Sequence, residues 1–120
     1  GIAGKVRTAL DTTLSLAPKH AEAHTAMAIY HGEIINKIGA MIGGLTYGAK
    51  ASEAEKHIKE ALKLTPASPI TNIEHGNLLM LLHGDKKEDA AAAAYEKAAA
   101  CKPQDAMEAL DAAYAKSELE

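Results

Sequence analysis

Three segments of this chain share one spacing of small or apolar residues, and each segment ends in a proline. The shared positions advance in steps of four, three and three residues, and the proline follows two residues later. Steps of three and four place side chains on one face of an α-helix. Proline lacks an amide hydrogen and disfavours helical geometry in the residue before it, so each helix must end near its proline. The three copies are Val6-Leu10-Thr13-Leu16-Pro18, Ala54-Ile58-Ala61-Leu64-Pro66 and Ala91-Tyr95-Ala98-Cys101-Pro103.

A second amphipathic stretch follows each proline, which gives six predicted helices in total. Ser52 with Glu55 forms a capping-box pattern, and Ser68 precedes Pro69 at a predicted helix start. Val6 is the only valine, and no segment alternates in the manner of a β-strand. The sequence therefore predicts an all-α fold with helices near 2–17, 20–42, 51–65, 69–83, 86–102 and 104–119.

These segments resemble the tetratricopeptide repeat. Its second helix carries a small, a bulky and a small residue and then a proline at this spacing, as residues 54–66 and 91–103 do. Gly76 fits the small position halfway along the family's first helix. The resemblance implies antiparallel helix pairs stacked as a right-handed superhelix, forming one domain over residues 1–120. That domain would comprise a helix at 2–17, a divergent repeat at 20–65, a repeat at 69–102 and a terminal helix at 104–119.

The repeats diverge from the family in length and in one side chain. The prolines are 48 and 37 residues apart, whereas the family repeat has about 34 residues. The longer repeat is expected to hold a loop at Gly43–Lys50. The large aromatic residue that the family carries early in its first helix is replaced by His24, Asn72 and Ala109. The runs GKVRTAL, HAEAH, GGLTYGAK and AAACKPQDAMEALD look like the C-terminal part of longer bacterial proteins of this family.

The resemblance implies a non-catalytic scaffold that holds a protein or peptide in a concave groove lined by its first helices. The family captures a terminal carboxylate with Lys, Arg and Asn side chains, and only Asn77 is present at the corresponding positions, so an apolar segment is the better ligand. Several groove positions recur at helical spacing, so packing in the core is the open alternative. The groove positions carried over from the family are Glu22, Thr25, Ile29, Glu33, Ile73, Asn77, Met80, Leu81, Met107, Leu110 and Tyr114.

Two other functions remain alternatives. His20, His24 and His31 lie roughly on one helical stripe and are candidate ligands for zinc, copper or nickel, although packing explains them without a metal. The chain is alternatively a structural segment that serves a longer protein or a homo-oligomer. The sequence itself predicts no cofactor.

Catalysis, nucleic-acid binding and membrane insertion have little support in the sequence. Cys101 replaces a leucine of the other copies, so it is interpreted as a small buried residue. The run 43–51 has the wrong spacing for a phosphate-binding loop. The net charge is −3, the basic residues are dispersed, and no window is apolar enough to span a membrane. Because the chain begins with Gly1, we expect a fragment, and the resemblance to longer bacterial proteins favours a periplasmic parent over a cytoplasmic one.

Overall fold

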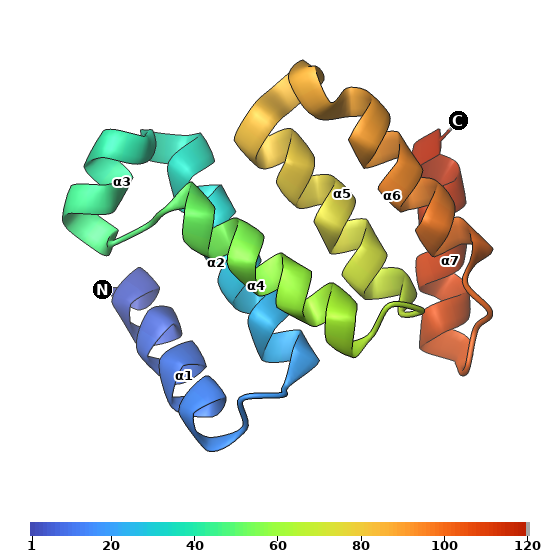
Figure 1. The fold of residues 1–120 in the computed structure, drawn as a ribbon, viewed down its shortest axis with the longest axis horizontal. Helices are drawn as coiled ribbons and strands as arrows, with labels where there is room; N and C mark the ends of the chain where they lie inside the picture. The colour runs from blue at the N-terminus through green and yellow to red at the C-terminus, as the bar shows by residue number, and fades with distance from the viewer. Residues whose placement is uncertain (120) are drawn as a thin grey trace. The chain divides into compact units, whose positions relative to one another are not determined.

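Each proline of the repeated spacing does end a helix in the computed structural model, which describes residues 1–119 (Figure 1). All regular structure in these residues is helical, as the sequence predicts, and every one of the six predicted helices is present. The structure adds a short α-helix and a 3₁₀ turn. The elements are α1 (Ile2–Leu16), α2 (Ala21–Ile38), α3 (Ala40–Tyr47), α4 (Ala51–Leu64), α5 (Pro69–His83), η1 (Gly84–Lys87), α6 (Glu88–Ala100) and α7 (Ala106–Leu119).

The turns after the three prolines share one construction. In each, the residue two positions after the proline caps the next helix, because its side chain accepts a hydrogen bond from the backbone N–H three residues further on. His20 accepts from Ala23 at 3.1 Å, Ser68 from Thr71 at 3.3 Å and Asp105 from Glu108 at 2.8 Å. The repeat in the sequence is therefore also a repeat in local structure.

Two of these turns carry a further hydrogen bond that ties the proline to the next helix. The residue six positions after the proline donates to the proline's carbonyl oxygen. His24 Nε2 lies 2.7 Å from Pro18 O, and Asn72 Nδ2 lies 3.0 Å from Pro66 O. The third turn has Ala109 at this place, which has no side-chain donor. His24 and Asn72 thus have a structural role of their own in two of the three turns.

The predicted helix 20–42 and loop Gly43–Lys50 are wrong in detail. The helix ends at Ile38, and residues 40–47 form α3 instead of a flexible loop. Gly39 separates the two helices with a φ of +86°, and Gly48 ends α3 with a φ of +66°, a region that favours glycine. A Cβ at Gly43 would lie 3.1 Å from Ile34 Cγ2, so this short helix approaches α2 closely.

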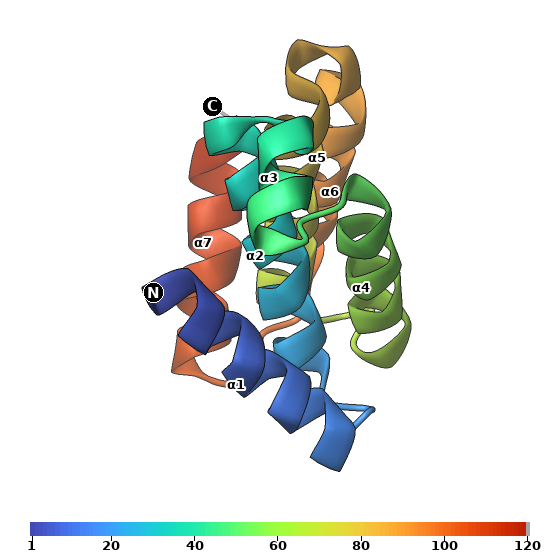
Figure 2. The same ribbon diagram turned by 90° about the vertical axis from the view of Figure 1, so that its left-hand side faces the viewer.

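Residues Gly1–Leu64 form one compact unit, in which α2 lies between α1 and α4 (Figure 2). The buried residues of α2 and α4 are mostly small. They are Ala23, Met27, Ala28, His31 and Gly32 on α2 and Ala54, Ile58 and Ala61 on α4. The low aromatic content of the sequence is consistent with this packing.

The second compact unit begins at Thr65 and contains α5, α6 and α7, each of which contacts the other two. Ile73, Ala98 and Ala115 form its buried cluster, one residue from each helix. Within residues 1–119, no helix is both long and apolar enough to cross a membrane. That the whole chain is a single domain stays a prediction.

Candidate functional site

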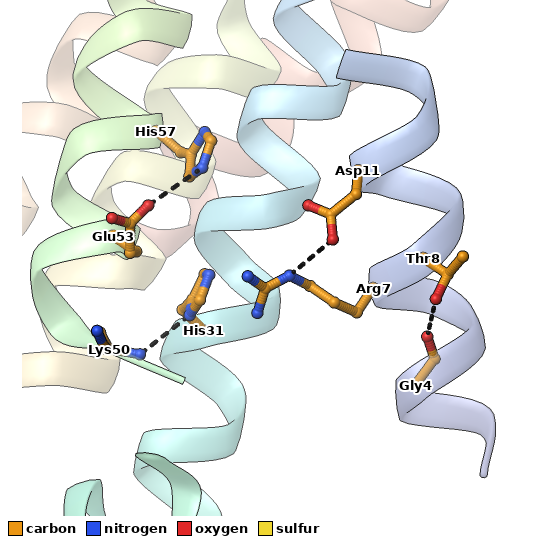
Figure 3. Close-up of polar contacts among 8 residues, drawn as sticks. All are labelled: Gly4, Arg7, Thr8, Asp11, His31, Lys50, Glu53 and His57. Carbon is orange, nitrogen blue, oxygen red and sulfur yellow. Dashed lines mark hydrogen bonds and ion pairs between the residues drawn. The ribbon is translucent and has the colours of Figure 1, made fainter. Parts of the chain in front are cut away.

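Two of the histidines that stand out in the sequence, His24 and His31, come together with His57 between α2 and α4. The Nδ1 atoms of His24 and His57 are 2.9 Å apart, and their ring centroids are 5.1 Å apart. The ring of His31 lies parallel to that of His57, with 6.5 Å between centroids (Figure 3). We call His24, His31 and His57 the histidine cluster.

The hydrogen bonds around the cluster fix which nitrogen of each neutral ring carries the proton. A carbonyl oxygen only accepts, so His24 must donate to Pro18 from Nε2, which leaves its Nδ1 as an acceptor. His57 therefore donates from its Nδ1 to His24. Its Nε2 then faces Glu53 Oε2 at 3.7 Å, and the two form an ion pair only when His57 is protonated (Figure 3). His57 and His24 thus form a chain of hydrogen bonds that runs from α4 to the carbonyl oxygen of Pro18, while His31 contacts His57 through its ring.

His31 is the most deeply buried member of the cluster. Its Nδ1 accepts a 3.0 Å hydrogen bond from the backbone N–H of Lys50, at the start of α4, and its Nε2 is buried without a hydrogen-bond partner. Burial, followed by the positive charge of Arg7, lowers the pKa of His31 from 6.5 to about 4. Arg7 itself pairs with Asp11 at 3.2 Å (Figure 3).

This pKa shift makes the fold sensitive to acid. An unfolded chain binds a proton at its histidine near pH 6.5, whereas folded His31 does so only near pH 4. The contribution of His31 to the free energy of unfolding is therefore fully present above pH 6.5 and is lost as the pH drops from 6.5 towards 4. Between these values the free energy of unfolding falls by about 1.4 kcal/mol per pH unit. Burial, followed by the proximity of His24, also lowers the pKa of His57, which acts in the same direction.

The three candidate metal ligands have structural hydrogen bonds in this fold. His20 caps α2, His24 links α2 to α4, and His31 accepts from Lys50, each through its Nδ1. Their Nδ1 lone pairs are occupied, so a metal would have to replace these bonds. Among residues 1–119, no group of three His, Cys, Asp or Glu side chains is placed to hold a metal ion.

The predicted groove residues on α2 are Glu22, Thr25, Ile29 and Glu33. Glu22 is exposed and the other three are half-buried. The Thr25 hydroxyl donates to Ala21 O, and Glu33 lies 3.8 Å from Lys37 Nζ. None of these four residues is among the buried residues of α2. Their contacts do not indicate a particular class of ligand.

The predicted groove residues on α5 differ in burial. Ile73 is buried against Ala98 and Ala115, so its side chain packs in the core and does not line a groove. Asn77 is half-buried and accepts a hydrogen bond from the Tyr95 hydroxyl, while its own amide donates to Glu74 at 3.1 Å. Met80 and Leu81 are half-buried.

The predicted groove residues on α7 are all exposed. Met107, Leu110 and Tyr114 have relative exposures of 65, 66 and 49%. Their spacing of three and four residues gathers them on one side of α7, whereas Ala112 and Ala115 are buried towards the other two helices. We call Met107, Leu110 and Tyr114 the α7 stripe.

Cys101 does not have the environment of a nucleophile. Its thiol donates to Lys97 O, and burial, followed by the carboxylate of Glu108, raises its pKa. A raised pKa disfavours the thiolate, which is the nucleophilic form. It is half-buried at the C-terminal end of α6, in the place where the other copies have leucine.

Sequence reasoning missed Tyr95 and His57 as members of polar networks. Their partners lie 18 and 33 residues away in the chain, so the contacts exist only once the helices are packed. Comparison of the chain with protein-family models, with curated proteins and with solved structures finds no match.

Proposed function

We propose that this protein is a non-catalytic interaction scaffold, built from stacked helix pairs of the tetratricopeptide type, that holds a segment of a partner protein or peptide. The observation that carries the proposal is the α7 stripe, three large apolar side chains left exposed on one side of a helix. Apolar side chains that gather on a surface in this way are typical of protein-binding sites.

The packing of the second unit supports the repeat architecture. In stacked pairs, the first helix of one pair contacts its own partner helix and also the first helix of the next pair. Here α5 contacts both α6 and α7, and α6 contacts α7 as well. The three equivalent proline turns support the same interpretation, because each begins a first helix with the same cap. In this scheme α7 is a first helix, and its stripe belongs to the binding surface.

The proposal is tested by selecting peptides from a random displayed library on the intact chain. We expect enriched peptides whose binding is lost in Leu110→Glu. The control is Leu16→Glu, which changes an equally apolar side chain that is 82% exposed on α1. Peptides that bind both variants as well as they bind the unmodified chain would overturn the assignment of the stripe. Ile73→Glu is unsuitable for this test, because it would place a charge in the core.

A further inference from the structure

The α7 stripe is bordered by carboxylates on its own helix. Asp111 follows Met107 by four residues, and Glu118 follows Tyr114 by four, so each lies on the same side of the helix as its apolar neighbour. Lys116, the lysine of α7, comes two residues after Tyr114 and so lies on the opposite side. The exposed face of α7 is therefore both apolar and acidic.

Helix α5 adds a third carboxylate near the same place. Glu118 hydrogen-bonds with Tyr114, and the charges of Glu118 and Glu74 both act on Tyr95, whose pKa is raised first by burial and then by these groups. Tyr95 and Glu74 are further linked through Asn77. Carboxylates from α5 and α7 thus converge at one end of the stripe.

The part of the chain that contains α7 also carries a negative net charge. Residues 65–120 contain five lysines and ten acidic residues, a net charge of −5, whereas residues 1–64 have a net charge of +2. A surface of one sign favours ligands of the other sign and speeds their association. The local carboxylates and the net charge act in the same direction.

From this charge and the exposed stripe we infer that the partner of the α7 stripe is a basic amphipathic segment, in which apolar side chains are flanked by lysine or arginine. This inference rests on the proposed scaffold function and specifies its ligand. An apolar segment without positive charge would bury the stripe but gain nothing from the carboxylates around it. A second copy presenting the same face would set carboxylates against carboxylates, which disfavours a symmetric dimer through this surface.

The test uses three synthetic helical peptides with the same apolar positions and with lysine, glutamine or glutamate at all remaining positions. Binding of each fluorescently labelled peptide to the intact chain is measured by anisotropy at low and at high salt. We expect the lysine peptide to bind most tightly, the glutamate peptide not to bind, and the affinity of the lysine peptide to fall as salt rises.

Two variants of the chain separate the apolar and the electrostatic parts of the site. Leu110→Ser should abolish binding of the lysine peptide. The double variant Asp111→Asn with Glu118→Gln should weaken it about threefold to tenfold, as expected for a pair of surface charges. The matched control is Asp85→Asn with Glu96→Gln, which removes the same charge from exposed positions on η1 and α6 and should leave the affinity unchanged.

The outcomes distinguish the inference from the function on which it rests. Equal binding of all three peptides, lost in Leu110→Ser, would overturn the basic partner and leave the scaffold function standing. No binding of any peptide at the stripe would count against both. Light scattering that shows a dimer dispersed by Leu110→Ser would overturn the basic partner in favour of a second copy.

Discussion

Gly76 allows α5 and α6 to approach closely, so replacing it with alanine should destabilise the second unit. A Cβ at this position would lie 3.0 Å from Cε1 and Cζ of Tyr95 and 3.2 Å from the backbone oxygen of Ala91. The Tyr95 ring is held by its hydrogen bond to Asn77, and the backbone oxygen moves only if α6 moves. Overfilling a packed interface of this kind costs about 1–3 kcal/mol.

Alanine also gains helix propensity over glycine, by up to about 1 kcal/mol, so a matched control is needed. Gly4 provides it, because it is also helical and a Cβ at Gly4 would meet no atom within 4 Å. For each variant we compare the free energy of unfolding with that of the unmodified chain. The change caused by Gly76→Ala should be less favourable than the change caused by Gly4→Ala by about 1–3 kcal/mol. Urea titration followed by the amide NMR signals of α6 and of α1 measures each variant in its own unit. Equal stabilisation by both substitutions would refute the close-approach argument.

Three further predictions concern polar groups. Asn72→Ala removes the hydrogen bonds to Pro66 O and Ser68 O from a buried position, and urea titration should show a loss of about 1–3 kcal/mol. Between about pH 6.5 and pH 5, the free energy of unfolding should fall by roughly 2 kcal/mol through His31 alone, and His31→Gln should remove that part of the slope. Tyr95→Phe leaves the Asn77 oxygen without its donor, so thermal unfolding should show a loss of about 1 kcal/mol. An unchanged pH slope in His31→Gln, or full stability of either other variant, would contradict the corresponding assignment.

Much of the fold follows from local features of the sequence. The prolines end helices for reasons of backbone chemistry alone, so Pro18, Pro66 and Pro103 predict where α1, α4 and α6 end without any knowledge of packing. The small position at Gly76 also proved to be a place of close approach. The sequence did not predict α3 because a stretch so rich in glycine usually indicates a loop. In the structure, Gly39 and Gly48 mark the two ends of this short helix.

The candidate site was less predictable, because it depends on which helices pack together. His24 and His31 lie on α2 and His20 caps it, but the partner that defines the cluster is His57 on α4. Helical spacing cannot separate an exposed apolar residue from a buried one. Ile73 and Leu110 illustrate this, since both occupy groove positions by resemblance but only Leu110 is exposed.

The most direct test of the scaffold proposal is to map where a bound peptide contacts the chain. A peptide selected on the intact chain would be titrated into isotopically labelled protein, and the shifts of backbone amides and methionine methyl groups would be followed by NMR. We predict that the shifts concentrate on α5 and α7, with Met107 among the largest. Shifts confined to residues of α1 to α4, or spread evenly over all helices, would contradict the account.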